Sequence, residues 1–186
     1  MRNIQFMKKY LIIICTILLC TSISFAQEIG KWRGGLEVGC LYPHQGGFGF
    51  LGAAEMKCNL QNNMNVGFKT EATSFWKNKN YSAKLLSFSV TYDYYLHYTN
   101  TRFSPFVGTG LGYYFCKSYD GGYDDPERKM NNPTGFIRTG FEAGKFRTTL
   151  TYNLVRQPNG RDEDKNNDYV ALSFGFYLGG EKWKKK

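Results

Sequence analysis

Beyond its first 26 residues, the sequence has no long apolar run. A membrane-spanning helix needs about 20 consecutive apolar residues, so none is predicted after residue 26. The mean hydropathy is negative, which taken alone would indicate a soluble secreted protein. Such averages hide short strands in which apolar and polar residues alternate. The missing run therefore argues against a helical membrane protein and leaves open a protein that crosses a membrane with strands.

Histidine and cysteine are also scarce. The two histidines, His44 and His97, are the only bases that titrate near neutral pH, and we expect them at opposite ends of the predicted sheet. Three cysteines follow residue 26, namely Cys40, Cys58 and Cys116, and this odd number does not suggest a disulfide framework. We expect all three on the apolar, lipid-facing sides of their strands. The sequence predicts no metal site, no cofactor and no catalytic residue.

The first 26 residues are typical of a secretory signal peptide. Three cations precede an apolar run over residues 10–19, and Ser24 and Ala26 are small at the two positions that a signal peptidase reads. We therefore expect cleavage after Ala26. A lipoprotein attached through Cys20 is an alternative, which the bulky Leu19 before it disfavours.

The formal net charge of the chain is +9. An exported protein is separated from nucleic acid, so we expect no nucleic-acid partner despite this excess. Part of the positive charge lies in a basic tail, residues 180–186. The tail is either a plain exposed end or a contact with anionic lipid or a cell-wall polymer.

Residues 103–116, with the sequence FSPFVGTGLGYYFC, alternate most clearly. Val107 and Phe115 share one face, whereas Gly108 and Gly110 share the other, which is the period of a β-strand. A soluble sandwich points its large residues inwards, but a narrow membrane barrel points them into lipid and keeps its interior small or polar. We therefore interpret this segment as a transmembrane strand.

The same alternation predicts eight strands in all. They cover residues 32–42, 48–60, 64–75, 83–98, 103–116, 135–144, 146–154 and 168–178. We expect short connections after the second, fourth and sixth strands and longer ones after the third, fifth and seventh. Outer-membrane barrels have short periplasmic turns and longer outer loops. The sequence therefore predicts an all-β fold, an eight-stranded antiparallel up-and-down transmembrane β-barrel over residues 27–179, with no further domain.

Charged residues on the inward-facing parity are balanced in number. Unpaired charges inside a narrow barrel would be costly, so we expect the five cations and five anions to fill the lumen as an ion-pair network. These residues are Arg33, Glu37, Glu55, Lys57, Lys69, Glu71, Asp93, Arg138, Glu142 and Arg147. The glycine face of residues 108–112 would leave space for their side chains. The alternative is a narrow, charged, water-filled pore.

The chain resembles the small OmpA/OmpX-like outer-membrane β-barrel family in its leader, its eight strands and the stretches SPFVGTGLGYYF, GFEAGKFRTTLTYNL and DYVALSFGFYLGGEK. The resemblance implies a place in the bacterial outer membrane and contact with its lipid, including lipopolysaccharide; we expect a monomer. Family members serve as structural anchors, adhesins, defence factors, narrow pores and, in a few branches, lipid-modifying enzymes. The last strand departs from the family pattern because it continues into EKWKKK instead of ending at an aromatic residue.

We expect contacts with a cell-surface or host ligand on the outer loops, since loops carry the variable chemistry of such scaffolds. The candidates are Trp76, Tyr81, Tyr119, Tyr123, Asp124 and Arg161. Carboxylates in the loop predicted over residues 117–132 could hold calcium loosely, but their spacing matches no EF-hand and a solvated loop is favoured.

A structural or surface-interaction protein is therefore the favoured function. A small pore is the second reading, and a lipid-modifying enzyme is less favoured because His44 has no serine in its own loop. The rival fold is a soluble, lipocalin-like periplasmic barrel, which would bury its large side chains instead of exposing them.

Overall fold

The computed structural model describes residues 29–44, 46–61, 63–78, 81–96, 103–120, 128–155 and 168–179. These residues form eight strands, which are β1 (Trp32–Pro43), β2 (Phe48–Gln61), β3 (Met64–Asn78), β4 (Tyr81–Tyr95), β5 (Phe103–Asp120), β6 (Arg128–Ala143), β7 (Phe146–Leu154) and β8 (Tyr169–Gly179). Within the described ranges, no helix is long and apolar enough to cross a membrane. The predicted signal peptide and the basic tail lie outside the described residues.

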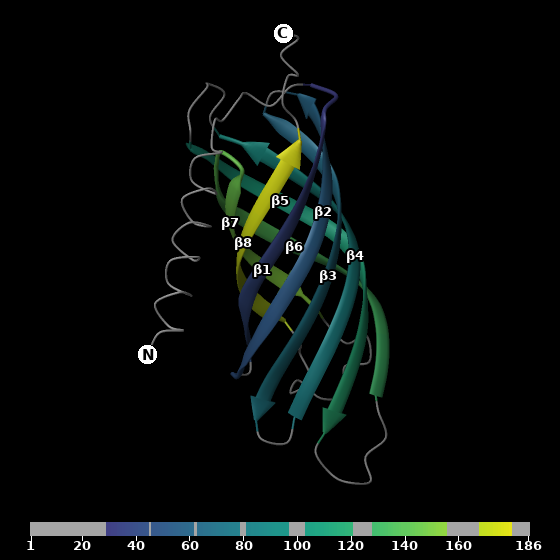
Figure 1. Ribbon diagram of the computed structural model, residues 1–186. Coiled ribbons are helices and arrows are strands. Elements are labelled where there is room, and N and C mark those ends of the chain that lie inside the picture. The colour runs from purple at the N-terminus through teal and green to yellow at the C-terminus, as the bar shows by residue number, and fades with distance from the viewer. Residues whose placement is uncertain are drawn as a thin grey trace, which may run out of the picture.

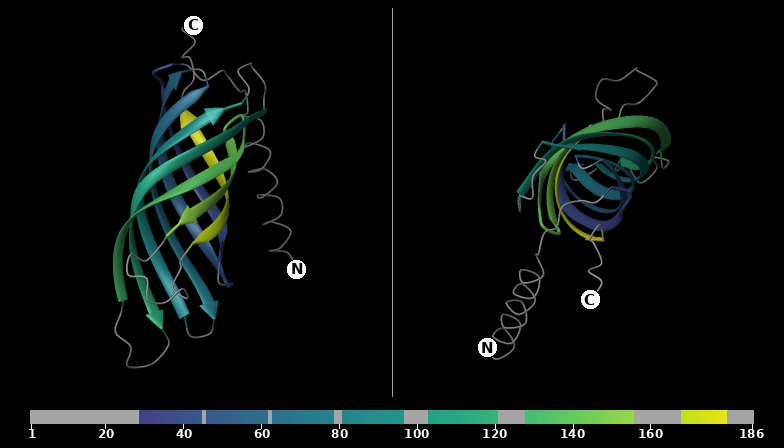
Figure 2. Two further views of the ribbon diagram at one scale, coloured as in Figure 1. Left: turned by 180° about the vertical axis from the view of Figure 1, so that it is seen from behind. Right: turned by 90° about the horizontal axis from the view of Figure 1, so that it is seen from above.

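The eight strands close into a barrel. Each strand pairs antiparallel with the next one along the chain, and β1 pairs with β8. Figure 1 shows the steeply tilted strands, and Figure 2 shows the closed ring from above. Closure gives each strand two neighbours, although residues 128–134 of β6 pair with β5 alone in the described part of the chain. The predicted fold class, an eight-stranded antiparallel up-and-down barrel, is confirmed.

The two ends of the barrel differ. We call the end at which β1, β3, β5 and β7 finish the loop end, which is the lower end in Figure 1, and the opposite end the turn end. At the turn end, β6 and β7 are joined by Gly144 and Lys145 alone, and Gly144 takes a left-handed φ of 66° that favours glycine. Residues 121–127 and 155–168 form connections at the loop end.

Several predicted strand limits at the loop end are wrong. β5 continues to Asp120 and β6 begins at Arg128, so the loop predicted over residues 117–132 is much shorter. The connection between β3 and β4, predicted to be long, consists of residues 79–80. Pro133, which precedes the strand predicted over residues 135–144, lies inside β6 opposite Tyr113. Its missing N–H is tolerated because β7 pairs with β6 only from Gly135 onward.

Large apolar side chains cover the outside of the barrel. In β2, exposed and buried residues alternate along nearly the whole strand. In β4, the outward side chains include Phe88, Val90 and Tyr92, and on β5 Leu111 is 75% exposed. A lipocalin-like barrel would place these large residues inside, so that rival fold is excluded. An apolar wall of this extent is unusual on a soluble monomer and suits a lipid surface.

The interior contains two layers. The first, here called the apolar layer, lies toward the loop end and consists of Leu41, Leu51, Phe75, Ala83, Leu85, Tyr114, Cys116, Val155, Tyr169 and Ala171. The alternation of residues in the sequence did not predict this layer. The second, here called the charged layer, occupies the middle and the turn end of the lumen.

The three cysteines differ in exposure. Cys40 is exposed and Cys58 half-buried, but Cys116 is buried, so the expectation that it faces lipid is wrong. The reason is its parity, because Cys116 lies two residues after inward-facing Tyr114 and directly after outward-facing Phe115. The three cysteines are not joined by disulfide bonds.

Candidate functional site

The charged layer contains all ten charged residues that were selected from their inward parity. They come from β1, β2, β3, β4, β6 and β7, and each side chain is buried. β5 contributes its glycine face and β8 contributes Tyr177 and Ser173 instead of charges. The layer therefore holds five cations and five anions, which are Arg33, Lys57, Lys69, Arg138, Arg147, Glu37, Glu55, Glu71, Asp93 and Glu142.

Asp93 is the centre of the charged layer. Arg138 donates to it twice, from Nε at 2.7 Å and from Nη2 at 2.9 Å. Lys57 donates to the same carboxylate at 2.9 Å, and Arg147 donates through Nη2 at 3.0 Å. Three cations thus converge on one carboxylate. Their positive charge is balanced further by Glu55, which accepts from Arg138 at 2.7 Å.

Glu142 extends the ion-pair network to the turn end. Its carboxylate accepts from Arg33 at 2.9 Å and from Arg147 at 2.8 Å. The hydroxyl of Tyr95 donates to it at 2.6 Å and accepts from Arg33 at 3.1 Å. Because Arg147 contacts both Glu142 and Asp93, it joins the turn end of the network to its centre.

Lys69 extends the network toward the loop end. Its ammonium lies 2.6 Å from Glu71 and 3.7 Å from Glu37. The hydroxyl of Tyr169, a member of the apolar layer, donates to Glu71 at 2.6 Å. Tyr177 lies 2.5 Å from Glu37 and 2.6 Å from Glu55 through its hydroxyl. The ten residues therefore form one continuous network that ends against the apolar layer.

Aromatic rings fill the remaining space between the charges. The guanidinium of Arg147 stacks over the ring of Phe106 at 3.7 Å, and that of Arg138 lies 5.6 Å from the ring of Phe136. The ammonium of Lys57 lies 4.7 Å from the ring of Tyr177. These rings were not predicted to belong to the charged layer, although their inward parity was an available signal.

The arrangement binds charges to one another and leaves few polar groups unsatisfied. In the described part of the chain, Arg33 Nε is the single buried polar atom of these ten side chains that lacks a hydrogen-bond partner. Charges buried this deeply are stable only with complete pairing, and loss of one partner typically costs about 3–5 kcal/mol. The layer therefore holds its charges on one another across the lumen.

The candidates for ligand contact are dispersed. Trp76 is exposed near the loop end of β3. Tyr81 and Tyr119 lie within β4 and β5 and not in loops, because these strands extend further than expected. Tyr123, Asp124 and Arg161 lie outside the described residues.

The histidines are placed only in part. His44 is exposed in the connection between β1 and β2, where its backbone N–H donates to the carbonyl of Asp168 at 2.9 Å. His97 lies outside the described residues. Among the residues that the structure describes, no group of three or more histidine, cysteine, aspartate and glutamate side chains could hold a metal ion.

Comparison with known proteins defines a class of fold, the small closed outer-membrane β-barrel. No protein-family model and no curated protein matches the sequence. Neisserial surface protein A has a similar structure, with a TM-score of 0.63 and 14% identity over 80% of this chain and 96% of that chain.

Two further barrels are similar at a TM-score of 0.55. The outer membrane enzyme PagL is 14% identical over 78% of this chain and 98% of its own. The outer membrane protein OprG from Pseudomonas aeruginosa is 12% identical over 82% of this chain and 98% of its own. Identities this low show a shared fold alone. The predicted resemblance is therefore confirmed for the fold.

Proposed function

We propose that the chain is a bacterial outer-membrane barrel with a plugged lumen, acting as a structural or surface-interaction protein through its loop end. Two features support the location. The outer wall is apolar on every strand, with Leu36, Phe68, Leu111 and Ile137 each more than half exposed. The similar structures named above are a surface protein and two outer-membrane proteins.

The observation that carries the proposal is the filling of the lumen by two layers. Ion pairs connect the charged layer from Arg33 at the turn end to Glu71. The apolar layer lies between Glu71 and the loop end. Eight strands leave just enough interior for side chains, so a solute would have to displace paired charges. We therefore assign the function to the outer surfaces of the barrel. A narrow pore is the less favoured alternative.

The loop end is the side that we assign to the cell exterior and to contact with a cell-surface or host ligand. A barrel of this class keeps both termini and its short turns in the periplasm. Outer-membrane lipid, including lipopolysaccharide, would surround a monomer. Trp76 is the described member of the candidate set whose side chain is exposed there.

Replacement of the loop-end connections tests this assignment. Residues 121–127 and 156–167 are exchanged for short Gly-Ser segments, which removes Tyr123, Asp124 and Arg161. We expect the variant to insert normally, as judged by heat-modifiable gel migration, but to lose adhesion or resistance phenotypes of the parent cells. A correctly inserted variant that retains every such phenotype would count against a surface-interaction role.

We also propose that the chain has no lipid-hydrolysing activity. The support is that His44 stands in a connection without a serine and that its described hydrogen bond is made by its backbone. Mass spectrometry after incubation with lipopolysaccharide should show unchanged lipid. Deacylation or acyl transfer would overturn this part of the proposal.

A further inference from the structure

Asp168 is a buried carboxylate at the loop end of the barrel. It lies directly before β8, and its side chain belongs to no part of the charged layer. Only 2% of its surface is exposed. Aspartate is almost never buried this completely without partners that compensate for the loss of water. The groups that Asp168 contacts therefore indicate its role.

The carboxylate of Asp168 extends the pairing between β7 and β8. The last backbone pair of these two strands toward the loop end is Asn153 with Tyr169. Beyond that pair, Oδ1 of Asp168 accepts a hydrogen bond from the backbone N–H of Val155 at 2.6 Å. A carboxylate that accepts from an amide forms a charge-assisted bond, which is stronger than a bond between neutral groups. The end of β7 is thus attached to the start of β8 by a side chain.

The backbone of the same residue holds the connection between β1 and β2. β1 and β8 pair as far as Pro43 and Tyr169. One step further, the N–H of His44 donates to the carbonyl of Asp168 at 2.9 Å. Gly46, with a left-handed φ of 81°, donates to the carbonyl of Pro43 at 3.0 Å and completes a tight turn around His44. Asp168 therefore joins the loop-end limits of three strands, β1, β7 and β8.

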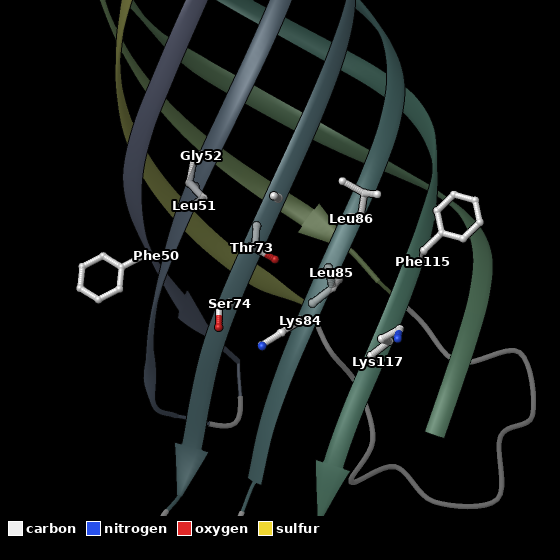
Figure 3. A pocket seen from close by; sticks show the side chains of 11 residues that line it. Phe50, Leu51, Gly52, Thr73, Ser74, Lys84, Leu85, Leu86, Phe115 and Lys117 are labelled. Carbon is white, nitrogen blue, oxygen red and sulfur yellow. The ribbon is translucent and has the colours of Figure 1, made fainter. Parts of the chain in front are cut away.

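The hydrogen bond to Val155 forms against the apolar layer. Val155 is itself a member of that layer and is 4% exposed. Figure 3 shows two further members of the layer, Leu51 on β2 and Leu85 on β4, on the barrel wall near the loop end. A backbone N–H beside such side chains is shielded from water and needs a protein acceptor. Removal of the carboxylate would leave this donor buried and unsatisfied, which is costly.

We propose that Asp168 is a positioning residue of the loop end. Its carboxylate fixes the end of β7, and the carbonyl held in place by that bond sets the position of the β1–β2 connection and of the exposed His44. The inference rests on the proposed function and deepens it, because it names a residue that orders part of the interaction surface without contacting a ligand. A purely local hydrogen bond would protect Val155 and leave His44 unaffected.

Amide hydrogen exchange, measured by NMR on the full chain folded in detergent micelles, tests the proposal. In the parent chain we expect the amides of Val155 and His44 to be protected. In Asp168→Ala both should exchange on the order of tenfold faster, although the mutation removes the direct partner of Val155 alone. Asp168→Asn retains a side-chain oxygen that can accept from Val155, so it should restore the protection of both amides.

Two controls lie close to Asp168 and far from it. The hydroxyl of Tyr152 lies 3.5 Å from Oδ2 of Asp168, beyond the usual length of a hydroxyl hydrogen bond. Tyr152→Phe should therefore leave both amides as protected as in the parent. The amide of Tyr95 donates to the carbonyl of Asn63 at 2.8 Å at the turn end. Its exchange should be the same in every variant, which shows that the barrel is folded.

Faster exchange at Val155 with unchanged exchange at His44 in Asp168→Ala would overturn the positioning role. Rapid exchange of both amides in the folded parent would also overturn it, and this result does not depend on whether Asp168→Ala folds.

Cell phenotypes separate this inference from the proposed function. Adhesion or resistance should be weaker with Asp168→Ala and like the parent with Asp168→Asn and Tyr152→Phe. If replacement of the loop-end connections abolishes these phenotypes and Asp168→Ala leaves them intact, the positioning role is refuted and the proposed function stands. If the loop replacement retains every phenotype, the proposed function is refuted, and amide exchange still decides whether Asp168 positions the β1–β2 connection.

Discussion

Gly110 on β5 lies directly opposite Phe136 on β6, and the ring of Phe136 occupies the space that a side chain at position 110 would need. A Cβ added at Gly110 would lie 2.6 Å from Cε1 of that ring. The glycine face was expected to border charged side chains. That holds for Gly108, beside Asp93 and Arg138, and is wrong for Gly110.

Gly110→Leu should therefore destabilise the barrel through overpacking. Overpacking costs typically about 1–3 kcal/mol, and a rigid ring against the backbone places this site at the upper end. Urea titration of the folded chain in lipid vesicles measures the free energy of unfolding. Gly34→Leu is the matched control, because a Cβ added there would meet no atom within 4 Å on the outer wall. Equal stability of Gly110→Leu and the parent would contradict this packing.

Arg147→Met should be among the most damaging single changes in the charged layer. It leaves Asp93 and Glu142 buried with one cation fewer each, and such a loss costs about 3–5 kcal/mol. The same urea titration measures the effect. Lys31→Met is the control, because Lys31 is exposed and should change stability little. A difference of less than about 1 kcal/mol between the two variants would argue against an interconnected plug.

Lys69 and Glu71 should be energetically coupled. Their charged atoms lie 2.6 Å apart in the buried lumen, so a double-mutant cycle of Lys69→Met and Glu71→Leu should give a coupling of about 0.5–3 kcal/mol. The double variant should lose less stability than the sum of the losses in the two single variants. A cycle of Lys69→Met with Lys31→Met should give no coupling. Additive effects in the first cycle would show that the pair contributes nothing.

Leu85 and Leu86 should respond differently to truncation although they are adjacent. Leu85 points into the apolar layer, whereas Leu86 points outward and is 42% exposed. Leu85→Ala leaves a cavity and should cost about 2–5 kcal/mol, while lipid can fill the space left by Leu86→Ala. Vesicle-based urea titration compares the two. A larger loss for Leu86→Ala would mean that the inside and outside of β4 are exchanged.

The alternation of residues was enough to predict the barrel and to select the ten charged side chains of the lumen. It failed at the loop end of β5 and β6, where residues such as Lys117 and Asn132 were taken for a loop. Outside lipid, a strand no longer needs an apolar face, so the signal fades while the pairing continues. Neighbouring apolar pairs such as Leu85 with Leu86 also hid the apolar layer, because they break the alternation.

Parity also could not reveal which charges meet. Asp93 and Arg138 lie far apart in the sequence, and only the register of β4, β5 and β6 brings both beside Gly108. Register depends on turn geometry and on packing inside the closed barrel. The convergence of three cations on Asp93 therefore required the structure.

Planar-bilayer recording of the purified, refolded chain tests the closed lumen most directly. Heat-modifiable gel migration of the same preparation establishes that the chain is folded before it is added. With paired charges from Arg33 to Glu71 and an apolar layer between them and the loop end, we predict no large, steady conductance. A steady, porin-like conductance from the folded chain would contradict the plugged barrel.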